Sequence, residues 1–514
     1  MTTEAEISEP KRRGLLFKVT VTLCVLAIIV AGWLFFERKR GQAALRSYEK
    51  QLLAKGEKLR FSEVMPPVPR GENKAVELVN LYFQTGAVLT ANSPPSMRCI
   101  VPGKAWVVTR ESEWFDKKVG KVTWEHVRTD LERNRDVLNQ LRALVRAPVL
   151  RYPLQYRGVS TLLPHLARQK GAAQWLSGSV LHKVHIGDIK GAVDDIESTI
   201  LLTRVTADEP FLISQLVRVA VIAIAVGDCW PLLQSNSLSE TELARLQQIF
   251  ERVDPIGPMV LGLQGERAMG RDTVDMIRTA QVNVEDLIGP GWGVDEEDNL
   301  PLDSVPYGNE LQGLVRGYVI YPAWRFAFSY EDEKHLFEEM QRIIEGTRAA
   351  NIEQSAALLG SLDKRLRDKA KPGGDFRSWR YFVTSLIMPG NAKAASRAFR
   401  AKSQCNIAVA AIALKRYYLR HKKYPGRLAE LVPEFVSEVP IDYMDGKPLR
   451  YRLDGGQFVL WSVGPDAKDG GGASNSKPNF GWLQGDDDVW PQPASPAEAA
   501  EYQQEQMKQP RPSK

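Results

Sequence analysis

The longest run of apolar residues in the chain lies near the amino terminus, from Gly14 to Phe36, and Lys18 is its only charged residue. As a helix this run is about 34 Å long, against a bilayer hydrocarbon core of about 30 Å. Trp33 and two phenylalanines stand at its far end, where aromatic side chains favour the membrane interface, and basic clusters flank both ends. The pattern predicts one transmembrane helix over residues 14–36.

A cleaved signal peptide is the alternative interpretation of this run. The apolar stretch is longer than a usual signal-peptide core, and no clear A-x-A cleavage site precedes a polar mature start. Basic residues are more numerous after the run than before it, which favours a cytoplasmic body. However, long domains translocate largely regardless of charge, so the charge pattern leaves the orientation open.

Between residues 74 and 390 apolar residues recur at intervals of three and four, which predicts an α-helical body. Ser239 and Glu242 form a capping-box pattern, and Pro210 is placed as at a helix start. The aromatic stretch Tyr318–Phe328 favours core packing over contact with lipid or a partner. The longest predicted helices span residues 122–145, 162–185, 189–205, 211–233, 239–253, 258–280 and 330–349.

One helical stretch, Gly187–Glu197, resembles the second helix of a tetratricopeptide repeat, with a Gly-Asp turn and a small alanine at the packing point. Only one copy is found, whereas a stacked array normally needs at least about three. Generic helical packing is therefore the favoured interpretation.

The pattern changes at Asn391. A helix rich in small residues is predicted to about Lys422, and two segments that alternate apolar and polar residues, Lys447–Leu453 and Gln457–Val463, follow as strands. The Asp-Gly-Gly sequence between these segments is a strong hairpin signal. The carboxy-terminal part is thus predicted to combine one long helix with a small antiparallel sheet.

Composition narrows the function classes. Hydrophobic residues make up 44% and charged residues 25% of the 514-residue chain, as in globular proteins, and a net charge of +6 spread over this length does not indicate nucleic-acid binding. Four widely spaced cysteines offer neither a disulfide framework nor a zinc site. His182 and His185 lie three residues apart, but no further ligand motif accompanies them.

Catalytic motifs are likewise missing from the sequence. It contains no G-x-S-x-G elbow, no P-loop and no G-x-G-x-x-G after a predicted strand. We therefore do not expect an enzyme and infer no small-molecule substrate.

Two loops rich in glycine and aspartate follow the second predicted strand, at Gly464–Gly472 and Gly485–Trp490. Calcium prefers several carboxylate and carbonyl oxygens on a backbone that is free to wrap around the ion. The alternative is a solvated acidic loop without a metal. The acidic run Asp295–Asp298, within a break rich in proline and glycine, is also predicted to be a solvated loop.

The segment Asn391–Pro491 resembles the globular part of the major pseudopilin of type II secretion, the protein G family. The shared motifs are a helix followed by Tyr424-Pro425, Val439-Pro440, Gly446-x-Pro-x-x-Tyr451, Ser462-x-Gly-x-Asp466 and a late acidic motif. This resemblance implies a long helix packed on a small antiparallel sheet and a calcium (Ca2+) site. Its implied oxygen donors are Asp466, Asp469, Asp486, Asp487 and Asp488.

Two features depart from that family. Its processed leader carries glutamate at the fifth position, where this chain has Val19, and a long helical body separates the apolar run from the pseudopilin-like segment. The layout as a whole resembles large envelope proteins of planctomycete and verrucomicrobial type.

The sequence therefore predicts an α+β protein in six parts. These are a cytoplasmic tail (1–13), a transmembrane helix (14–36), a helical stalk with a Pro-rich linker (37–72), an α-helical domain (73–390), a pseudopilin-like domain (391–491) and a disordered tail (492–514). We expect a single-pass protein of the bacterial inner membrane with an extracytoplasmic body, which binds envelope proteins of type II secretion or pilus-like machinery. The alternatives are an extracytoplasmic hydrolase built in the helical body and a cytoplasmic tetratricopeptide-like adaptor.

Overall fold

The computed structural model is mostly helical, with a small three-stranded antiparallel sheet, and so confirms the coarse α+β expectation. It describes residues 9–67, 70–84, 96–101, 104–108, 115–116, 120–121, 124–235, 237–282, 319–349, 380–381, 383–384, 388, 390–472 and 487–490, with single residues between 352 and 361 and at 500 and 504. The predictions for Asp295–Asp298, for Asp486 and for most of the carboxy-terminal tail lie outside these residues.

The chain forms two compact units, each assembled from three segments. Unit 1 contains Met1–Phe61, Arg267–Gln341 and Arg365–Pro389. Unit 2 contains Ser62–Glu266, Arg342–Lys364 and Gly390–Lys514. Residues far apart in sequence therefore build each unit.

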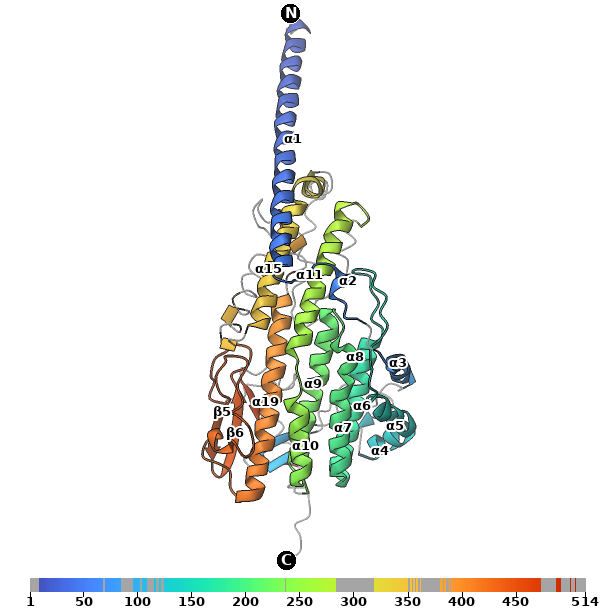
Figure 1. Ribbon diagram of the computed structural model, residues 1–514, viewed down its shortest axis with the longest axis vertical. Helices are drawn as coiled ribbons and strands as arrows, with labels where there is room; N and C mark the ends of the chain where they lie inside the picture. Colours follow the sequence, from blue (N-terminus) through green and yellow to red (C-terminus); the bar gives the residue numbers. More distant parts are fainter. Residues whose placement is uncertain are drawn as a thin grey trace, which may run out of the picture. The chain divides into compact units, whose positions relative to one another are not determined.

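Helix α1 (Glu9–Ala54) is the main element of unit 1. The predicted transmembrane helix and the charged stalk after it form one continuous helix (Figure 1), because the sequence places no proline between residues 14 and 54. Side chains of the apolar run are exposed from Phe17 onward, whereas Leu45 and Leu52 are buried against Phe337. The other elements of unit 1 are α14 (Tyr321–Ala323), the π-helical η4 (Trp324–Phe328), most of α15 (Ser329–Arg348) and the second half of α11 (Ile256–Arg278).

Two helices among the described residues are long and apolar enough to cross a membrane, α1 and α9 (Leu212–Leu233). They differ in burial. The most apolar window of α1 has none of its residues buried, whereas most of α9 is buried in unit 2. Burial on this scale is typical of a core helix in a soluble domain, so α1 is the candidate membrane segment.

Five long helices lie side by side in unit 2 (Figure 1). They are α6 (His165–Ile186), α7 (Ile189–Leu202), α9, α10 (Glu240–Glu251) and α19 (Asn391–His421). Shorter helices complete the unit: α2 (Phe61–Val64), α3 (Ala75–Gln84), α4 (Trp124–Arg133), α5 (Arg135–Leu144), α8 (Arg204–Ala207) and η5 (Leu428–Leu431). The periodicity of apolar residues thus located the long helices of the body.

Local signals fix several helix ends. The capping box of α10 is confirmed, because the Ser239 hydroxyl accepts from the Glu242 amide and the Glu242 carboxylate accepts from the Ser239 amide. Gly187 ends α6 in the left-handed conformation, and Asp188 then caps α7. Pro210 lies just before the N-cap residue of α9, so this helix begins slightly later than the proline suggests.

The sheet of unit 2 has the order β5 (Arg450–Asp454), β6 (Gln457–Ser462), β7 (Asp488–Trp490), with both pairings antiparallel. Asp454 pairs with Gln457 across the predicted hairpin, and the two glycines of the turn both have positive φ. Helix α19 packs on β6 and β7. The predicted combination of one long helix and a small antiparallel sheet is therefore confirmed.

The structure corrects the all-helical interpretation of residues 74–390. Strands β1 (Ser96–Val101) and β2 (Lys104–Val108) form an antiparallel hairpin there, and β3 (Phe115–Asp116) pairs with β4 (Gly120–Lys121). The sequence does carry the physical reason, since Pro102-Gly103 is a turn signal between two short segments that contain valine.

One border of the compact units falls between Pro389 and Gly390, next to the expected domain border, but the segment that begins at Gly390 is not a unit by itself. Unit 2 includes residues on both sides of this border. One hydrophobic core contains Ile196 of α7, Cys229 of α9, Leu246 of α10, Leu414 of α19 and Leu460 of β6. The long α19 shares one face with the helical body and another with the sheet, and this sharing joins the two parts.

Candidate functional site in the carboxy-terminal module

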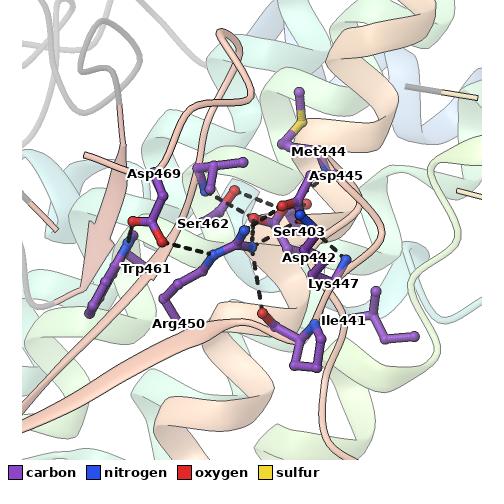
Figure 2. A network of polar contacts seen from close by, with 12 residues as sticks. Ser403, Ile441, Asp442, Met444, Asp445, Lys447, Arg450, Trp461, Ser462 and Asp469 are labelled. Atoms are coloured by element: carbon purple, nitrogen blue, oxygen red, sulfur yellow. Dashed lines mark hydrogen bonds and ion pairs between the residues drawn. The ribbon is translucent and has the colours of Figure 1, made fainter. Parts of the chain in front are cut away.

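Asp442 is the centre of the polar network that holds the carboxy-terminal module together (Figure 2). Its side chain is completely buried. Oδ1 accepts hydrogen bonds from the Ser403 hydroxyl at 2.9 Å, the Ser462 hydroxyl at 2.8 Å and the Met444 amide at 2.9 Å, and Oδ2 accepts from the Val463 amide at 2.9 Å. One carboxylate thus ties α19, strand β6 and the loop before β5 to one point.

Arg450 supplies the positive charge of this network (Figure 2). Its Nη1 lies 3.2 Å from Asp442 Oδ2 and 3.0 Å from Asp445 Oδ1, Nη2 bonds the second Asp445 oxygen, and Nε lies 3.5 Å from Asp469 Oδ2. The hydrogen bonds with Asp445 raise the pKa of the guanidinium. Burial opposes ionisation of Asp445, but hydrogen bonds from Arg450 and Lys447 outweigh it and lower the pKa of that carboxyl.

Asp469, a predicted calcium donor, lies beside this network. Its Oδ1 accepts from Trp461 Nε1 at 2.9 Å and from the Gly471 amide at 3.0 Å. These bonds, that of Trp461 first, lower the pKa of Asp469. The side chain therefore holds the glycine-rich loop against strand β6.

Asp487 faces the same loop from the position directly before β7. Its two oxygens accept from the amides of Gly470 at 3.2 Å and Gly472 at 2.9 Å. Burial, together with the negative charges of Asp469 and Asp466, raises the pKa of Asp487. Asp487 thus lies close enough to Asp469 and Asp466 to be affected by their negative charges.

Asp488 is directed elsewhere. Arg400 of α19 bonds both of its oxygens, with Nε at 2.8 Å from Oδ2, and Gln404 Nε2 lies 3.4 Å from the same oxygen. The Asp466 carboxylate accepts from the Lys468 amide at 3.0 Å. Of the five predicted donors, the structure therefore gathers Asp466, Asp469 and Asp487, pairs Asp488 with α19, and does not describe Asp486.

The described residues do not complete a metal centre. Among them, no group of three or more histidine, cysteine, aspartate or glutamate side chains is arranged to hold a metal ion. The carboxylates of the loop accept instead from backbone amides, from Trp461 and from Arg450.

Sequence reasoning missed Asp442, Asp445 and Arg450, although an Asp-x-x-Asp pair just before a predicted strand was a visible signal.

The helical part of unit 2 contains a second set of buried charges. Asp195 of α7 is fully buried and bonds Arg142 Nε at 2.6 Å, Lys183 Nζ at 2.7 Å and the Ser179 hydroxyl at 2.6 Å. These donors come from α5 and α6, so the carboxylate joins three helices. Two cations and a hydroxyl satisfy its charge, as a buried carboxylate requires.

Asp228 of α9 is the less compensated acid. It is buried, and Ser177 donates to its Oδ1 at 2.6 Å, whereas no hydrogen-bond partner reaches Oδ2 within the described residues. Burial raises the pKa of Asp228 to about 8, and the Ser177 bond only partly opposes this. The carboxyl is therefore protonated in the folded protein at neutral pH.

A pH dependence of stability follows from this carboxyl. Its folded pKa lies above the ordinary value of 3.8, so between these values the unfolded chain loses a proton that the folded chain keeps. The contribution of Asp228 should therefore become destabilising as the pH rises from about 4 to about 8, by an amount on the order of a few kcal/mol. The thermal midpoint of the wild-type protein should therefore fall as the pH rises through this range. In the Asp228→Asn variant it should fall less. An unchanged pH profile would contradict the assignment.

Comparison with known proteins does not assign the chain to a family. No protein-family model, curated protein or solved structure matches the chain.

Proposed function

We propose that the protein is a membrane-anchored structural or interaction protein of the bacterial envelope. Its amino-terminal helix would hold it in the inner membrane, and its carboxy-terminal module would bind other envelope proteins of type II secretion or pilus-like machinery. The observation that carries this proposal is the contrast along α1, where the apolar residues 17–36 are largely exposed and the following turns are packed into unit 1.

The apolar part of α1 supports the anchor because it has the length and composition of a membrane span. Leu26 is 58% exposed and Ile28 is 71% exposed, a level of apolar exposure that a helix in water does not sustain. The same helix continues without interruption to Ala54. An uncleaved anchor would therefore be connected to the rest of unit 1 by a continuous helix, without a flexible linker.

The carboxy-terminal module supports the binding role by its arrangement. A long helix, α19, packs on the small antiparallel sheet β5-β6-β7, as the resemblance to the major pseudopilin implies. The described module carries its charged residues in internal pairs such as Arg450 with Asp445 and Arg400 with Asp488. Such satisfied pairs make the module rigid, as a binding surface requires.

Topology and partners test the proposal together. A reporter that is active only outside the cytoplasm, fused after Lys514, should be active, and its cytoplasm-only counterpart should be silent. Cross-linking in intact cells should recover envelope or secretion proteins with the wild-type chain. Asp442→Ala is the matched control, because it should disturb the module, leave the anchor in place and lose those partners. A cytoplasmic carboxy terminus would contradict the proposal and favour the adaptor alternative.

Calcium binding by the loop around Asp469 and Asp487 is a second part of the proposal. Burial raises the pKa of Asp487, the charges of Asp469 and Asp466 add to this effect, and a cation there would offset those charges. Calcium prefers carboxylate and carbonyl oxygens on a flexible, glycine-rich backbone. Calcium should raise the thermal midpoint of the full-length protein, and Asp487→Asn should abolish the rise. Magnesium at equal concentration is the control for ionic strength. A thermal midpoint that does not change with calcium concentration would contradict calcium binding. The loop would then be held only by its hydrogen bonds to protein groups.

A further inference from the structure

The end of the apolar run on α1 lies against a segment from much later in the chain. The ring centroids of Trp33 and Phe328 are 5.7 Å apart in an edge arrangement. Arg38 Nη1 donates to the Phe326 carbonyl at 2.9 Å, and the same guanidinium lies over the Phe326 ring at 4.9 Å and the Tyr330 ring at 5.3 Å. The segment Val319–Phe328 is therefore placed at the level of residues 33–38, where the predicted membrane span ends.

This segment has a buried face and an exposed face. Trp324 and Phe328 are buried, and Trp324 Nε1 donates to the carboxylate of Asp332 at 2.9 Å. Val319 is 60% exposed and Phe326 is 43% exposed. The buried face fixes the segment on unit 1, so the exposed apolar side chains are held in place rather than free to fold inward.

Paired charged residues follow directly after residues 33–36 of α1 and after Phe328. Arg40 Nη2 lies 2.7 Å from Glu37 and 3.0 Å from Glu331, and Arg380 Nη2 lies 2.9 Å from Glu37 and 2.6 Å from Glu331. Four charges from three segments of unit 1 thus form a closed ion-pair network. The change from exposed apolar to paired charged side chains occurs at the same height on α1 and on its neighbouring segments.

We propose that Val319–Phe328 is a second membrane contact, in which Val319 and Phe326 enter the boundary between lipid headgroups and acyl chains beside α1. This inference rests on the proposed anchor. The occupant is the bilayer because the segment continues the apolar surface of α1, and because aromatic side chains with nearby arginine and lysine are typical of the membrane interface. Arg38 and the exposed Lys39 are placed to meet anionic headgroups.

Position-specific fluorescence in vesicles tests the contact. Cys24 and Cys99 are first replaced by serine in the full-length chain, because the other two cysteines, Cys229 and Cys405, are buried. An environment-sensitive dye is then attached after Phe326→Cys or, in a second variant, Val319→Cys. The vesicles contain phosphatidylcholine and phosphatidylglycerol. Two quenchers are compared: a nitroxide attached to the lipid acyl chain near the carbonyl group, and iodide dissolved in the water.

Two exposed residues of α1 serve as matched controls. Phe35→Cys reports the anchor itself, and Leu53→Cys lies about 27 Å further along the same helix, beyond the membrane level. At Phe326 and Val319 we expect lipid quenching close to that at Phe35 and several-fold stronger than that at Leu53, with the reverse order for iodide.

The controls separate the possible failures. If the dye at Phe35 is not quenched by lipid, the proposed anchor itself fails. If Phe35 is quenched by lipid while Phe326 and Val319 behave like Leu53, only the second contact is overturned. Protection of Phe326 and Val319 from both quenchers would also overturn it, because a protein surface, such as a second copy of the chain, would then cover the segment.

Discussion

Replacing Asp442 by alanine is expected to lower the free energy of unfolding of the carboxy-terminal module by about 3–5 kcal/mol. The substitution leaves Arg450 without one of its partners, and it strips the amides of Met444 and Val463 and the Ser462 hydroxyl of their acceptor inside the core. Each buried donor left unsatisfied costs about 1–3 kcal/mol. The loss should therefore exceed that of an ordinary surface substitution several-fold.

Hydrogen exchange of the amides in β5 and β6 is the suitable measurement, because two compact units need not unfold in one step. Asp454→Asn is the matched control, since this exposed residue of the hairpin should change stability by no more than about 0.5 kcal/mol. The exchange rates of Asp442→Asn should lie between those of Asp442→Ala and Asp454→Asn. The asparagine oxygen can still accept hydrogen bonds, but its NH2 group would face other donors and could not bond them. Equal exchange rates in all three variants would contradict the role assigned to Asp442.

Gly265→Ala is expected to destabilise unit 2 by about 3 kcal/mol, the upper end of the usual cost of overpacking. A Cβ atom at this position would lie 1.7 Å from the carbonyl oxygen of Pro210 and 2.6 Å from its carbonyl carbon. Both clashing atoms belong to the backbone, so a side-chain rotation cannot relieve them. Helix α11 must instead move away from the turn that begins α9.

Gly227→Ala is the matched control for this substitution, because it makes the same chemical change inside another helix. Within the described part of the chain, no atom outside the local helix backbone lies within 4 Å of a Cβ added there. Alanine in a helix interior is favoured over glycine by about 0.5–1 kcal/mol. The control should therefore match or exceed the wild-type thermal midpoint while Gly265→Ala falls well below it. Similar midpoints for the two variants would refute the close approach of Gly265 to Pro210.

Local patterns were sufficient to predict much of the fold. The apolar residues of α1, the three-and-four spacing of the long helices, the capping box at Ser239 and the turn at Gly455-Gly456 each depend on residues close in sequence. The small hairpins before residue 122 were missed because each strand is short and lies within a region dominated by helical spacing.

The role of each acidic residue depended on contacts that no local pattern contains. Asp488 was one of five aspartates predicted as calcium donors, yet its partner is Arg400, which is 88 residues earlier in the chain. Asp442 was not singled out, because its hydroxyl donors Ser403 and Ser462 are 39 and 20 residues away. Adjacent carboxylates in a strand point to opposite faces, so neighbours in sequence need not share a site.

The sequence by itself thus determined the long apolar amino-terminal helix, the other long helices, the carboxy-terminal hairpin and the presence of acidic, glycine-rich loops. Only the tertiary structure decided that α19 is shared between the helical body and the sheet, that Arg450 links Asp442, Asp445 and Asp469, and that Val319–Phe328 lies beside the end of the apolar run. The physical reason is the range of the interactions. Helix and turn propensities act over a few residues, whereas the donors that surround a buried carboxylate are brought together by packing of distant segments.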